Sequence, residues 1–89
     1  MPMEALTLAN TASQELYITN TIKLAKDKKQ RSDVREKAIS SIHDLCRDGL
    51  ISDKDAIRVL GEIIEEVDPE NIHEVGIISE ARRMMAYIM

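Results

Sequence analysis

Residues 52–69, SDKDAIRVLGEIIEEVDP, decide the fold of this chain. Their apolar positions recur every three or four residues, which is the spacing of one face of an α-helix. Ser52 precedes the first apolar position and is expected to be the N-cap. Asp68-Pro69 is expected to end this helix and to start the next, because proline disfavours helix at the residue before it yet fits the first helical position. The helices predicted from this region span 53–67 and 69–88.

The region before residue 52 shows the same periodicity. Its apolar stripe consists of Val34, Ala38, Ile42 and Leu45. Ser32 or Asp33 is expected to cap this helix, and Gly49 followed by Leu50 is typical of a helix C-terminus. These signals predict a helix over 33–48.

The N-terminal segment is less regular, because several β-branched residues weaken its helix preference. A helix over about 4–29 is still predicted from its apolar spacing, and it starts either near Glu4 or near Thr11. Four amphipathic helices with short connections favour an all-α fold, a small up-and-down four-helix bundle, with residues 1–89 as a single domain. A three-helix bundle with an N-terminal arm is the alternative.

The composition places the chain among globular proteins, with 44% hydrophobic and 31% charged residues and a net charge of −4. It contains no apolar run of membrane-spanning length and no secretory signal, so we expect no membrane partner. A single cysteine, Cys46, cannot form an internal disulfide, which favours a reducing compartment and a cytoplasmic location.

Two stretches resemble a known family. Ser32-Asp33-Val34-Arg35-Glu36-Lys37-Ala38 resembles the start of the second helix in uncharacterised protein family 0147, a family of small archaeal proteins. The stretch from Asp55 to Ile63, followed by Asp68-Pro69 and His73, resembles its third helix and the turn after it. The family's second proline after this turn is absent here. The resemblance implies a small helical bundle from the archaeal cytoplasm, and it implies no activity and no site residues.

Charge is distributed unevenly along the chain. Residues 23–37 contain seven basic and three acidic residues, a net charge of +4, whereas residues 44–80 have a net charge of −8. The basic cluster could contact nucleic-acid phosphates or could be a solvated turn. A role as an RNA- or ribosome-associated protein is therefore the alternative function, and its candidate phosphate contacts are Lys26, Lys28, Lys29, Arg31 and Arg35.

Residues that could carry chemistry do not form complete constellations. His43 and Cys46 lie one helical turn apart, but a closed zinc site needs two further ligands. Glu70 and His73 have the spacing found in two-metal bundles, which require a second copy of that motif. We therefore predict no catalytic residue, no metal, no cofactor and no small-molecule substrate.

The predicted last helix has an apolar face broader than a small bundle needs. Its candidate interface residues are Ile77, Ala81, Met84, Met85 and Ile88. We therefore predict a non-enzymatic protein-protein interaction or assembly module that forms a homo-oligomer or binds a protein partner.

Overall fold

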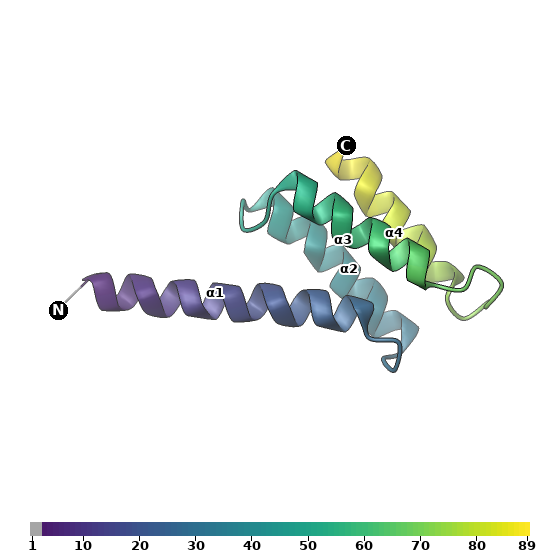
Figure 1. The fold of residues 1–89 in the computed structure, drawn as a ribbon, viewed down its shortest axis with the longest axis horizontal. Helices are drawn as coiled ribbons and strands as arrows, with labels where there is room; N and C mark the ends of the chain where they lie inside the picture. The colour runs from purple at the N-terminus through teal and green to yellow at the C-terminus, as the bar shows by residue number, and fades with distance from the viewer. Residues whose placement is uncertain (1–2) are drawn as a thin grey trace.

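The computed structural model describes the backbone of residues 3–89 and the side chains from Ala12 onward. Four helices make up this region (Figure 1): α1 (Met3–Lys26), α2 (Ser32–Arg47), α3 (Asp53–Glu66) and α4 (Val75–Ile88). Residues 3–89 contain no strand, so the predicted all-α fold is confirmed. Each helix reverses the direction of the one before it, as in an up-and-down four-helix bundle (Figure 1).

The helices are not packed equally. Helix α2 contacts each of the other three, and α4 packs on both α2 and α3. Helix α1 packs mainly on α2 and meets α3 only at its C-terminal end, where Lys26 Nζ lies 3.5 Å from Glu62 Oε1 and 3.7 Å from Glu66 Oε1. The N-terminal half of α1 extends well beyond the other helices (Figure 1), and the molecule is 55 Å long but only 28 × 16 Å across.

Local hydrogen bonds explain where α2 ends and α3 begins. Gly49 has a φ of +79°, and its N–H donates to the Cys46 carbonyl (3.1 Å), while the N–H of Leu50 donates to the Leu45 carbonyl (2.9 Å). This is the Schellman arrangement, which glycine favours because it lacks a Cβ. Ser52 caps α3 as predicted, since its Oγ accepts the N–H of Asp55 (3.1 Å).

The N-terminus of α2 is held differently from the prediction. The residue at the cap position is Arg31, and its side chain makes no capping hydrogen bond. Ser32 is the first helical residue, and its hydroxyl donates to the carbonyl of His73 in the connection between α3 and α4. A side chain expected to cap its own helix therefore fastens a distant loop to that helix.

Helix α1 is shorter at its C-terminus than the predicted range of 4–29. It ends at Lys26 because the next residue, Asp27, closes a turn. The Asp27 carboxylate accepts the N–H of Lys29 (2.9 Å), and its carbonyl accepts the N–H of Gln30 (3.1 Å). The helix also starts before Thr11, which decides between the two predicted starts.

Helix α4 begins at Val75, so the predicted start at residue 69 is wrong. Asp68 does not cap a helix, because its carboxylate accepts the N–H of Glu70 (3.0 Å) within a turn. Asn71 makes a second such turn by accepting the N–H of His73 (2.9 Å). Short polar side chains that bond nearby amides compete with helix formation in this way. Residues 68–74 therefore form two consecutive turns rather than a first helical turn.

The core lies among α2, α3 and α4. Its fully buried large apolar side chains are Ile39, Ile42, Leu45, Leu60, Ile63 and Ile77. Among the described side chains of α1, the only buried ones are Thr21 and Ala25, both near its C-terminal end. The interior is therefore built by three helices and closed by the last turns of α1.

Candidate protein-interaction site

The face of α4 predicted to be an interface is largely part of the chain's own core. Ile77, Ala81 and Met84 are at most 4% exposed, so they cannot reach a partner without unfolding. Met85 and Ile88 are partly buried against the same core. The prediction is wrong for the three buried residues because α4 packs against two helices at once, and two contacts require a broad apolar face.

Three of the five predicted phosphate contacts are either paired with carboxylates or buried. Lys26 Nζ faces the two glutamates of α3 described above, and Arg31 Nε lies 3.2 Å from Asp33 Oδ1. Lys28 and Lys29 are exposed in the turn between α1 and α2. The structure therefore does not bring the five basic residues together on one open surface.

Arg35 is buried, with only 1% of its surface exposed, so its prediction as a phosphate contact is wrong. Its Nε donates to the Ala25 carbonyl at the end of α1 (3.0 Å), and its Nη1 lies 3.7 Å from Glu74 Oε1. The other oxygen of Glu74 accepts the N–H of Asp68 (3.2 Å). Arg35 therefore links α2 to α1 and to the turns before α4, and its role is structural.

His43 and Cys46 line a polar hollow of about 330 Å³ at the C-terminal ends of α2 and α4. Cys46 Sγ donates to Asp53 Oδ1 (2.9 Å), and this hydrogen bond is the main reason that the thiol pKa rises to about 11. The thiol is therefore protonated at neutral pH and is a poor nucleophile. Among the described residues, no group of three or more His, Cys, Asp or Glu side chains is placed to hold a metal ion.

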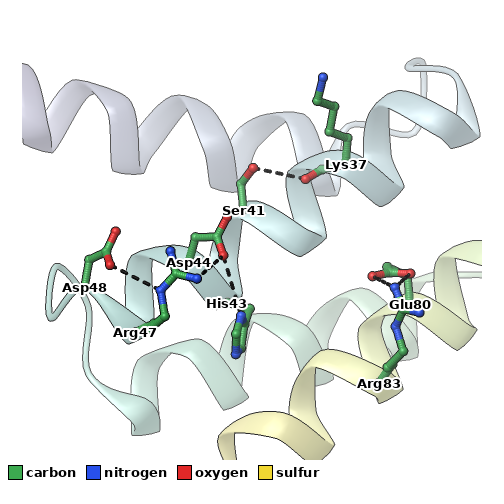
Figure 2. A network of polar contacts seen from close by, with 8 residues as sticks. All are labelled: Lys37, Ser41, His43, Asp44, Arg47, Asp48, Glu80 and Arg83. Atoms are coloured by element: carbon green, nitrogen blue, oxygen red, sulfur yellow. Dashed lines mark hydrogen bonds and ion pairs between the residues drawn. The ribbon is translucent and has the colours of Figure 1, made fainter.

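His43 has neighbours that explain its position without a ligand. Its ring lies 5.6 Å from that of Tyr87, at an angle of 57°. Its Nδ1 is 3.6 Å from Asp44 Oδ1, and the same carboxylate lies 3.5 Å from Arg47 Nη1 (Figure 2). This cluster is a set of contacts between neighbouring residues on the exposed end of α2.

An apolar groove lies open between α1 and α2. It has a volume of about 240 Å³ and is walled almost entirely by apolar atoms. Three of its residues lie one turn apart on α1 and four lie on α2. The lining residues are Tyr17, Thr21, Leu24, Val34, Lys37, Ala38 and Ser41.

The Thr21 and Ser41 hydroxyl groups in the groove donate to backbone carbonyls, which makes these positions less polar. Thr21 Oγ1 donates to the Tyr17 carbonyl (2.7 Å), and Ser41 Oγ donates to the Lys37 carbonyl (3.1 Å; Figure 2). Tyr17 is 52% exposed and Leu24 is 39% exposed, so both keep apolar surface in water. Covering such an apolar surface with a partner is favourable, because it removes the surface from water.

Sequence reasoning missed this groove although the signal is present. Tyr17, Thr21 and Leu24 are spaced by four and three residues, as are Val34, Ala38 and Ser41. Each set predicts a helical stripe, but not that the two stripes lie side by side and face water.

Comparisons of the chain with protein-family models, with curated proteins and with solved structures find no match. The resemblance to family 0147 therefore stays a prediction that rests on the residues quoted above. No helix among the described residues is long and apolar enough to cross a membrane.

Proposed function

We propose that this protein is a non-enzymatic interaction module that works by binding another helix in the groove between α1 and α2. The observation that carries the proposal is the groove itself, an apolar hollow with large half-exposed side chains on its walls. Grooves of this kind accept one face of an amphipathic helix, whose apolar residues repeat every three or four positions. This proposal therefore places the interface in the groove between α1 and α2 and not on α4, where the sequence predicted it.

Two further observations support a binding role over a catalytic one. The only cysteine donates a hydrogen bond to the Asp53 carboxylate, which raises the thiol pKa and disfavours the thiolate. Arg35, the one buried charged residue of the described region, has contacts that connect α2 to the end of α1 and to Glu74. We also place the protein in the cytoplasm, because a free thiol is what a reducing compartment preserves.

RNA or ribosome association, the alternative function, has weaker support. It rests on Lys28 and Lys29 together with the net positive charge of residues 23–37. Neither tyrosine lies in that turn to stack on a base, and Arg35 is buried.

Site-specific photo-crosslinking in living cells tests the proposal. A photo-reactive amino acid at position 37 stands on the groove, and the matched control is the same amino acid at the exposed position 82 on α4. We expect a crosslinked species of defined mass from position 37 alone, and its loss when Leu24→Glu is added. Equal crosslinking from both positions, or none from position 37, would contradict the proposal.

A further inference from the structure

The groove is open in the described part of the chain. It runs along the C-terminal half of α1, and α1 is one continuous helix, so its own N-terminal half cannot fold back into the groove. The groove includes Lys37, and Lys23, Lys28 and Lys29 on or beside the C-terminal end of α1 are also exposed. Its occupant should therefore be a helix that is rich in apolar residues and carries negative rather than positive charge.

Two helical segments carry net negative charge, namely α3, whose apolar face is buried in the core, and the part of α1 that precedes the groove. Residues 3–16 of α1, which precede the groove, include two acidic residues, Glu4 and Glu15, and no lysine or arginine, so their net charge is −2. The side chains of residues 12–17 are all exposed, with Leu16 at 61% and Tyr17 at 52%. This half of α1 extends past the other helices (Figure 1). A helix of this length has marginal stability in water when nothing packs against it.

From the opposite charges of the N-terminal part of α1 and the lysines beside the groove, we infer that two copies of the chain associate through antiparallel α1 helices. Each copy lays the N-terminal half of its α1 along the groove of the other. This inference rests on the proposed function and names its partner as a second copy. A two-fold axis brings the same residues together from both copies, and the antiparallel direction sets the acidic N-terminal part of each α1 against the exposed lysines beside its partner's groove. A parallel pair would instead place the two basic regions side by side.

Tyr17 and Thr21 then lie near the two-fold axis, because they are at the junction between the exposed half of α1 and the groove. Each dimer buries two copies of Tyr17 and Leu24. Changing one of them to glutamate therefore places two charges in the interface, and we expect the dimer dissociation constant to rise roughly a hundredfold or more.

Analytical ultracentrifugation of the full chain tests this inference. The chain has a mass of 10.1 kDa, so the wild-type protein should sediment at twice that mass at micromolar concentration. Tyr17→Glu and Leu24→Glu should sediment as monomers with unchanged helical circular dichroism, since both side chains are partly exposed. The matched control is Tyr87→Glu on α4, where Tyr87 is 64% exposed, and it should remain dimeric.

Disulfide crosslinking tests the direction of the pair in a Cys46→Ser background. If the helices cross between Tyr17 and Thr21, Ser13 of one copy lies opposite Leu24 of the other. A mixture of Ser13→Cys and Leu24→Cys chains should then form the mixed disulfide in preference to the Ser13→Cys homodimer.

Three outcomes overturn the inference. They are a wild-type monomer at all concentrations, a dimer lost only in Tyr87→Glu, and a preferred disulfide between two Ser13→Cys chains. The proposed function is judged separately, because crosslinking from position 37 to a protein of another mass would sustain it while the second-copy inference failed.

Discussion

Replacing Arg35 by alanine and by methionine separates two contributions of this buried side chain. The guanidinium donates one good hydrogen bond, from Nε to the Ala25 carbonyl at 3.0 Å. A hydrogen bond from a charged donor contributes about 1.5–3 kcal/mol. The contact of Nη1 with Glu74 Oε1 is longer, 3.7 Å, and contributes roughly 1 kcal/mol or less.

A buried polar atom opposes these contributions. Nη2 is buried and has no hydrogen-bond partner, which costs about 1–3 kcal/mol. The net contribution of the guanidinium is therefore small, and Arg35→Met is expected to lower the free energy of unfolding by about 1–2 kcal/mol, because the substitution leaves the Ala25 carbonyl without its side-chain donor. Arg35→Ala also removes the methylene groups of the side chain, each worth about 0.8 kcal/mol, and leaves a cavity. We expect it to be less stable than Arg35→Met by about 2 kcal/mol.

Urea denaturation followed by circular dichroism at 222 nm measures both variants. Arg58 on α3 supplies the matched control, because its side chain is 62% exposed and its ion pairs lie on the surface. Arg58→Met and Arg58→Ala should both lie within about 0.5 kcal/mol of the wild type. Equal losses above about 3 kcal/mol in the two Arg35 variants would refute the reasoning, since the guanidinium rather than its aliphatic stem would then stabilise the fold.

Three further predictions concern local structure and the thiol. Gly49→Ala should lower the free energy of unfolding by about 1 kcal/mol, because the φ of Gly49 is +79°. Gly61→Ala should raise the free energy of unfolding by up to about 1 kcal/mol, because a Cβ at this helical position meets nothing within 4 Å. Thermal denaturation in which both variants shift the melting temperature in the same direction would contradict this. Ser52→Ala should cost about 1 kcal/mol through loss of the cap on α3, and Ser52→Thr should restore most of it in the same assay. The Cys46 pKa of about 11 means that the fraction of reactive thiolate rises only as the pH approaches 11, so alkylation by iodoacetamide at pH 8 should be slow. Asp53→Asn should accelerate this alkylation roughly tenfold or more, because it removes the carboxylate that accepts the thiol proton. Equal alkylation rates in the two proteins would show that this hydrogen bond does not hold the proton.

The helix ends that were predicted correctly depend on neighbours in the sequence. Gly49 and Leu50 end α2, and Ser52 starts α3, through hydrogen bonds that span no more than five residues. The start of α4 was predicted wrongly because two kinds of local signal compete there. Proline favours a helix start, but Asp68 and Asn71 bond the amides two residues on and produce turns instead.

The candidate site was much harder to predict than the helices. The apolar stripe of α4 looked like an interface, and the charge of Arg35 suggested exposure, yet both lie inside the bundle. The groove was missed because its two walls, on α1 and α2, are each ordinary helical stripes. Only their packing shows that no third helix of the described chain covers them.

The sequence by itself determined that this protein is helical and where most of its helices end, because periodicity, caps and turns act over a few residues. The tertiary structure alone decided which apolar side chains are buried and which face water. Burial depends on what lies across from a side chain, and partners such as Arg35 and Ala25, or Ser32 and His73, are 10 and 41 residues apart. The exposed groove exists because α3 and α4 both pack on the other side of α2, so nothing in the described chain covers α1 and α2 there.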